Sequence, residues 1–143
     1  MRLLAPLLEE CGVSAVFSGH VHDYQRSKPL HFSPNDPAPR IVTGPIRGTF
    51  VLDEQFDGVS RTVPDGVVYF VTGGGGASLY TRMPGDSEAL APDPDAATSI
   101  TAKFVSDRHS FSVIDVDTRQ LTLRQIDIKG EEVDRVTITK PAH

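Results

Sequence analysis

The chain has 143 residues, of which 38% are hydrophobic and 23% are charged, and its net charge at pH 7 is −5. These values are ordinary for one globular domain that buries a core without cross-links. The acidic balance excludes electrostatic attraction to nucleic acid or to an anionic membrane, and no apolar run approaches the ~20 residues of a membrane-spanning helix. Cys11 is the only cysteine, so an internal disulfide and a cysteine-ligated zinc cluster are excluded.

A short helix and a strand are predicted at the N-terminus. Residues 3–11 carry apolar side chains at helical spacing, and we expect Cys11 to be buried among them. Pro6 is tolerated only in a first turn, so the helix should begin late, and Gly12 is suited to its C-terminal cap. Residues 13–18 are typical of a short buried strand. No signal-peptide cleavage site follows, and the compartment stays open.

The middle of the chain alternates turn-rich and strand-like segments. Residues 27–66 and 77–103 are rich in Pro, Asp and Gly, and we predict loop-rich insertions there. Residues 67–72 form a continuous β-favouring run, which predicts a central strand that ends in four glycines, residues 73–76. Glycine N–H groups can bind phosphate, but no Gly-Lys-Ser/Thr follows. We therefore interpret the run as a turn that lets another segment pass close by.

The last third of the sequence predicts a β-meander. Three strand-like runs, at residues 109–116, 120–128 and 133–140, are separated by short turns.

Two histidines, His20 and His22, follow the first predicted strand, with Gly19 before them. In an extended segment residues i and i+2 face the same way, ~6.6 Å apart. Their imidazoles can converge on one metal, or each can bind one of two metals ~3.5–4 Å apart. Gly19 would allow the tight turn that such a loop needs. The alternative is that both are ordinary polar residues at a strand end.

Residues 18–26, SGHVHDYQR, resemble the last signature block of the calcineurin-like metallophosphoesterases. Tyr24 and Arg26 indicate the purple acid phosphatase-like branch. A strand ending in a glycine run and a closing β-meander follow in the same order. The resemblance implies that residues 1–143 are the C-terminal portion of a single metallophosphoesterase domain. The implied fold class is α+β: a β-sandwich flanked by helices, mostly β in this chain.

The resemblance also implies a chemistry. His20 would bind one metal of a binuclear centre and His22 the other, with iron, zinc or manganese as the metals. A metal-held hydroxide would attack the phosphorus of a phosphomonoester or diester substrate.

Neighbouring residues would support the metal ligands. Asp23 would accept a histidine N–H or would be a solvated loop acid. Tyr24 would pack and orient the loop rather than contact substrate, and Arg26 would hold a carboxylate or the loop backbone rather than the phosphate. His31 is a weaker candidate for substrate contact. His109, Tyr80 and Arg82 are expected to be a sheet-edge residue and two surface-loop residues.

Most of the family's metal-binding blocks have no counterpart here. There is no Gly-Asn-His, and the Asp-x-His at Asp107 to His109 and the Gly-Asp pair at Gly85 and Asp86 both lie downstream of the two histidines, in the wrong order for the family. A hydrolytic metal normally has three or more protein ligands. We therefore expect no tight metal site and no efficient catalysis from this chain alone, and we assign no catalytic residue within it.

Two alternatives differ in class. A cupin would also use His-x-His, but it needs a Glu three or four residues later, where Gln25 and Arg26 stand. A non-catalytic module would bind a partner, or a second copy of itself, through an unpaired sheet edge.

Overall fold

The structure is a computed structural model, and it describes residues 2–37, 46–80 and 100–141. In chain order the elements are η1 (Arg2–Leu4), α1 (Ala5–Glu10), β1 (Ala15–Ser18), β2 (Tyr24–Ser27), β3 (Leu30–Pro34), β4 (Gly48–Leu52), β5 (Val68–Thr72), β6 (Thr101–Val105), β7 (Ser110–Val116), β8 (Gln120–Asp127) and β9 (Glu132–Thr139).

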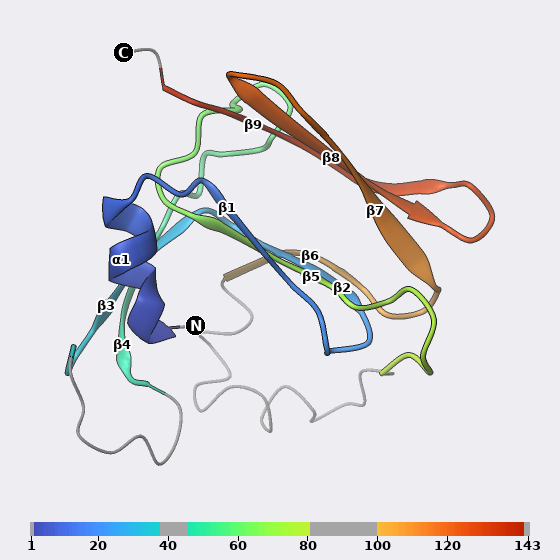
Figure 1. The fold of residues 1–143 in the computed structure, drawn as a ribbon, viewed down its shortest axis with the longest axis horizontal. Coiled ribbons are helices and arrows are strands. Elements are labelled where there is room, and N and C mark those ends of the chain that lie inside the picture. Colours follow the sequence, from blue (N-terminus) through green and yellow to red (C-terminus); the bar gives the residue numbers. More distant parts are fainter. Residues whose placement is uncertain (1, 38–45, 81–99, 142–143) are drawn as a thin grey trace.

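The strands form three sheets, in the orders β1-β5-β2-β6, β3-β4 and β7-β8-β9. The predicted meander and the predicted central strand are confirmed, since β5 lies between β1 and β2. Strands β1 and β5 are parallel, whereas β2 is antiparallel to both β5 and β6. Figure 1 shows the meander lying across one face of the four-stranded sheet, with α1, β3 and β4 beyond the sheet. The described part is thus mostly β, with one short α-helix, and resembles part of a β-sandwich.

The main core fills the space between the two larger sheets. Alternate residues of β5 point to opposite faces, which places Val68 and Phe70 toward the meander and Tyr69 away from it. The buried members of this core come from five strands: Tyr24, Val68, Phe70, Val105, Leu123, Val136 and Ile138.

A second core lies under the β3–β4 hairpin, within a segment predicted to be a loop-rich insertion. Leu30 and Phe32 of β3 are 5% and 2% exposed, and they pack with Ala5 of α1. The alternation in Leu30–Pro34 is too short to stand out between turn signals, which explains the difference. The other predicted insertion, residues 77–103, ends in β6, while residues 81–99, including Arg82, lie outside the described residues.

Helix α1 begins late, with Pro6 in its first turn, as predicted. Gly12 has φ +67°, and the N–H groups of Gly12 and Val13 donate to the carbonyls of Glu9 and Leu8, which is a Schellman cap. The prediction that Cys11 is buried is wrong, because Cys11 caps the helix in the turn that leads to β1 and is exposed. No helix in the described part is long and apolar enough to span a membrane.

One carboxylate docks α1 on the hairpin. Glu9 accepts a hydrogen bond from Nδ1 of His31 at 2.6 Å and another from the backbone N–H of Phe32 at 3.0 Å. Nε2 of His31 reaches Asp65 at 3.1 Å. The hydrogen bond to Glu9, followed by that to Asp65, raises the pKa of His31 above 6.5.

This contact predicts a pH-dependent stability. A raised pKa in the folded state means that protonated His31 stabilises the fold below pH 6.5, and this contribution is lost as the pH rises through the folded-state pKa. Urea unfolding of the unaltered chain and of His31→Gln should therefore differ more at pH 6 than at roughly pH 8.5. An equal difference at both pH values would contradict a charged His31–Glu9 pair.

Candidate metal centre

The two histidines lie in a bent loop, residues 19–23, which we call the His loop and which joins β1 to β2. His20 is exposed and has φ +75°, in the left-handed region that non-glycine residues rarely adopt. The N–H of Asp23 donates to the carbonyl of Val21 at 2.9 Å, which tightens the bend. The His loop is therefore bent rather than extended, and the positive φ falls on His20 rather than on Gly19. Such strain is typical of functional loops.

His22 is held in one orientation and one tautomer. Its Nδ1 lies 2.9 Å from the carbonyl oxygen of Ser78, and because a carbonyl only accepts, Nδ1 carries the proton. The ring of Tyr80 stacks on the imidazole, with centroids 4.4 Å apart, and the Tyr80 N–H donates to the His22 carbonyl at 3.1 Å. In neutral His22 the lone pair is thus on Nε2, which is how metal-binding histidines are commonly arranged.

The glycine run packs directly against the His loop. Since β1 and β5 are parallel, the loop after β1 and the glycines after β5 lie at the same end of the sheet, where both strands have their carboxyl ends. A Cβ on Gly73 would meet the Val21 carbonyl oxygen at 2.0 Å. Gly73 N–H donates to the Asp23 carbonyl at 3.0 Å, and Gly74 accepts from Ser110 N–H at 3.1 Å. These contacts match the interpretation of the run as a close-passing turn.

Tyr24 and Arg26 meet a carboxylate on the opposite sheet. Nε and Nη2 of Arg26 donate to the two oxygens of Asp134 at 2.8 and 3.1 Å, and the Tyr24 hydroxyl donates to Asp134 at 2.7 Å. The side chains of Arg26 and Asp134 are only 11% and 7% exposed. We call this group the inter-sheet clamp, because Tyr24 and Arg26 lie on β2 and Asp134 on β9 (Figure 1).

In the clamp the positive charge of Arg26 compensates for the buried negative charge of Asp134. Burial acts to raise the pKa of Asp134, but the hydrogen bond and charge of Arg26 outweigh it and hold that pKa below its ordinary value. Burial, and then the charge of Asp134, raise the pKa of Tyr24, so its hydroxyl remains a donor. Both β2 side chains are thus engaged within the protein rather than directed at a substrate.

Asp134 was missed by the sequence reasoning, although the sequence carries a signal for it. Asp134 alternates with Val136 and Ile138, both buried, and therefore shares their inward face. An acid at such a position needs a cationic partner.

Asp23 lies at the end of the His loop and is 3% exposed. Nε2 of Gln25 donates to both of its carboxylate oxygens, at 3.1 and 3.0 Å. The acceptor for His22 Nδ1 is the carbonyl of Ser78, a residue that no sequence pattern indicated.

The other histidine candidates lie in different surroundings. His31 pairs with Glu9 and Asp65 at the α1–hairpin contact, as described above. Nδ1 of His109 lies 3.2 Å from the Gly74 carbonyl, on the side of the glycine run that faces β7.

The metal-binding capacity of the described residues is limited. Among residues 2–37, 46–80 and 100–141, no group of three or more His, Cys, Asp or Glu side chains is placed to hold a metal ion. His20 and His22 contribute imidazoles only, fewer than the three ligands of a hydrolytic site. These residues do not by themselves fit a binuclear centre, and we derive no reaction step through one.

The clamp predicts a large difference between two aspartates. Asp134→Ala leaves the Arg26 charge buried without its partner, and we expect a loss of about 3 kcal/mol in unfolding free energy. Asp115→Ala is the matched control, because the Asp115 side chain is 72% exposed and its carboxylate lies as far as 3.8 Å from Nη2 of Arg124. This substitution should lower the unfolding free energy by less than about 1 kcal/mol. Equal losses in urea unfolding would argue against the clamp.

The close approach of Gly73 to the Val21 carbonyl predicts a similar difference in stability between two glycine substitutions. Gly73→Ala forces the Val21 carbonyl to move, and we expect it to cost about 1–3 kcal/mol and to shift the NMR signals of the His22 ring. Gly76→Ala is the control, because a Cβ there meets nothing within 4 Å. Unchanged His22 signals in Gly73→Ala would show that the run does not position the loop.

Comparison with known proteins identifies a structural neighbour but no family. No protein-family model matches the chain, and no curated protein matches it. Among solved structures, the purple acid phosphatase PPD1 from seeds of yellow lupin (Lupinus luteus) is similar, with a TM-score of 0.59 and 21% sequence identity. The match covers 96% of this chain and 19% of the lupin protein, so this chain spans about a fifth of its neighbour's length. At that identity the likeness shows that the chain shares the fold of part of the lupin protein, and nothing finer.

Proposed function

We propose that this chain is the C-terminal portion of a metal-dependent phosphoesterase that hydrolyses a phosphomonoester or diester at a binuclear centre of iron, zinc or manganese. The observation that carries the proposal is the setting of His22. Its Nδ1 is fixed by Ser78 and its ring by Tyr80, and no residue in the described part of the chain makes a hydrogen bond to its Nε2. The fold-level likeness to a purple acid phosphatase supports the same direction.

The roles we assign follow from position. His22 Nε2 would bind one metal, and His20, whose backbone has a φ of +75°, would bind the second. Tyr24 and Arg26 fix β2, and so the end of the loop, through Asp134. A binuclear centre completed by further ligands would supply a hydroxide nucleophile and neutralisation of phosphoryl charge.

The remaining ligands belong to residues beyond the described part of this chain or to another chain. We therefore expect the 143-residue chain alone to bind metal weakly and to hydrolyse phosphate esters poorly.

A second candidate function is favoured by a different observation. Phe17 stacks on Phe70 toward the main core yet is 39% exposed. Ile114 lies opposite the buried Leu123, so it shares the inward face of the meander, but it too is 39% exposed. Within the described part, β1 and β7 each pair on one side only. An open side of this kind suits a non-catalytic module that binds a second copy of the chain.

One experiment separates these proposals. The purified chain is passed through gel filtration, and its mass, its metal content and its hydrolysis of p-nitrophenyl phosphate with added Zn²⁺ or Mn²⁺ are measured. The phosphoesterase proposal predicts a monomer with little retained metal and a slow metal-dependent hydrolysis, which His20→Ala and His22→Ala abolish. His31→Gln, which removes a histidine outside the His loop, should leave this hydrolysis unchanged.

Other outcomes change the conclusion. A metal-free dimer without hydrolysis favours the binding module. Two retained metal equivalents contradict the incomplete site and require ligands from elsewhere. Hydrolysis that survives both histidine substitutions overturns the roles given to His20 and His22.

A further inference from the structure

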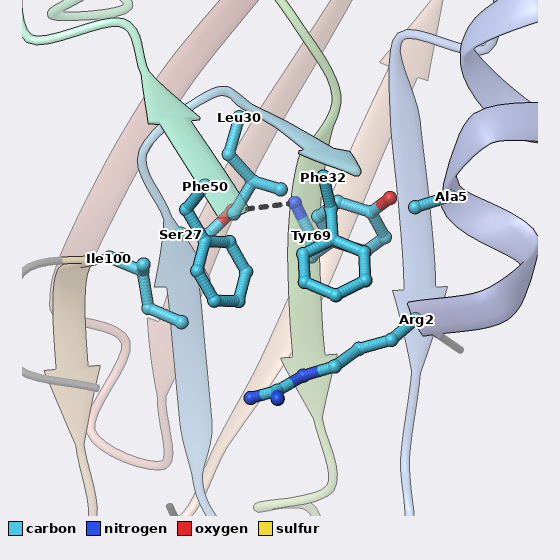
Figure 2. A pocket seen from close by; sticks show the side chains of 8 residues that line it. All are labelled: Arg2, Ala5, Ser27, Leu30, Phe32, Phe50, Tyr69 and Ile100. Carbon is cyan, nitrogen blue, oxygen red and sulfur yellow. Dashed lines mark hydrogen bonds between the residues drawn. The ribbon is translucent and has the colours of Figure 1, made fainter. Parts of the chain in front are cut away.

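His31 lies on the outer face of the β3–β4 hairpin, between carboxylates from two different segments. Leu30 and Phe32, its neighbours in β3, line the pocket of the second core (Figure 2). Successive side chains of a strand point to opposite faces, so His31 points away from that pocket. Its side chain is 39% exposed, and it contacts Glu9 of α1 through one ring nitrogen and Asp65 through the other.

The two contacts together require a charged imidazole. Nδ1 lies 2.6 Å from Oε2 of Glu9, and Nε2 lies 3.1 Å from Oδ1 of Asp65. An ionised carboxylate only accepts hydrogen bonds, and a neutral imidazole has a single N–H. Both ring nitrogens can therefore donate at once only when His31 carries a positive charge. Neutral His31 keeps one of these hydrogen bonds and gives up the other.

The hydrogen bond to Asp65 is the one that neutral His31 gives up. The Glu9 side chain is 23% exposed and also accepts from the backbone N–H of Phe32 at 3.0 Å, so its position does not depend on His31 alone. The Asp65 side chain is 87% exposed, and in the described part of the chain His31 is its one hydrogen-bond partner. A lone pair on Nε2 would face the anionic oxygen of Asp65, and this exposed carboxylate can turn to water instead.

Asp65 also belongs to the wall of a cavity. A cavity of about 450 Å³ lies within residues 52–65, and both Asp53 and Asp65 line it. This segment joins the two cores, because Leu52 packs on the second core and Phe56 on the main core. The backbone N–H of Asp65 donates to Oδ2 of Asp53 at 3.0 Å, which closes the backbone of the segment. The Asp65 side chain can therefore leave His31 without unfolding the segment.

Apart from these two carboxylates, the groups around His31 carry no charge that changes near neutral pH. Its neighbour across the hairpin is Val51. On β5, burial and then the charge of Glu9 raise the pKa of Tyr69, so that hydroxyl keeps its proton. Burial acts to raise the pKa of Asp53, but hydrogen bonds from three backbone N–H groups outweigh it and hold that pKa below its ordinary value. His31 is thus the group of this cluster that titrates near neutral pH.

We propose that the His31–Asp65 contact is a proton-operated latch at this cavity. Charged His31 holds the Asp65 side chain, which turns to water and widens the mouth of the cavity when His31 loses its Nε2 proton. The hydrogen bond to Glu9, followed by that to Asp65, raises the pKa of His31 above 6.5. The latch is therefore closed at roughly pH 6 and opens as the pH rises through the raised pKa. The proposal is independent of the phosphoesterase, since no residue of the His loop lines this cavity.

The test is an NMR pH titration of the isotope-labelled chain between roughly pH 5.5 and roughly pH 9. Both ring nitrogens of His31 should carry protons at the low pH, and the neutral ring should keep its proton on Nδ1, toward Glu9. The two Hα–Hβ couplings of Asp65 should be unequal at low pH and become equal through the same transition, because a freed side chain samples several rotamers. A neutral ring with its proton on Nε2, or Asp65 couplings that do not change with pH, would overturn the inference.

Matched variants assign the change to the latch. Asp65→Ala should lower the measured pKa of His31 by about half a pH unit, the size expected for an exposed ion pair. Asp115→Ala removes an exposed carboxylate from the meander and should leave that pKa unchanged. His31→Gln should make the Asp65 couplings independent of pH, whereas His109→Gln should not. Equal His31 titrations in the unaltered chain and in Asp65→Ala contradict the latch, and the high exposure of Asp65 lets this variant fold even where His31→Gln does not.

Discussion

The inter-sheet clamp is the interaction on which the candidate site depends. One nearly buried carboxylate, Asp134, accepts two hydrogen bonds from Arg26 and one from Tyr24. Because these partners are separated by more than 100 residues, the clamp fixes the two larger sheets in relation to each other. A buried ion pair is not a strong source of net stability, but a bidentate pair with a third donor specifies one arrangement of its partners. Here that arrangement positions the strand that immediately follows the His loop.

The loop is also held from its other sides. Gly73 leaves room for the Val21 carbonyl, and the glycine run links the loop to β7 through Ser110. Ser78 and Tyr80 then orient the His22 ring. We attribute the positive φ of His20 to these contacts, which hold the loop in one backbone conformation. The metal-ligand role proposed for His22 rests on this preorganisation rather than on the presence of two histidines in the sequence.

Local patterns predicted much of the fold but not its long-range contacts. The meander, the central β5, the late helix start and the cap at Gly12 follow from period-2 alternation, a β-branched run, a proline and a glycine. The β3–β4 hairpin was missed because its burial comes from packing under α1. The exposure of Cys11 and the bend at His20 also depend on how the chain reverses direction in three dimensions. For the site, residue spacing located His20 and His22, whereas Ser78 and Asp134 reach it only through folding.

The central claim is that the fold presents Nε2 of His22 to a metal. The most direct test is the tautomer of His22, read from the ring ¹⁵N shifts of the labelled chain at a pH where the imidazole is neutral, before and after addition of Zn²⁺. We predict a proton on Nδ1 in the metal-free chain and a zinc-dependent shift confined to Nε2. A proton on Nε2, or a ring that exchanges freely between tautomers and does not respond to zinc, would contradict the claim.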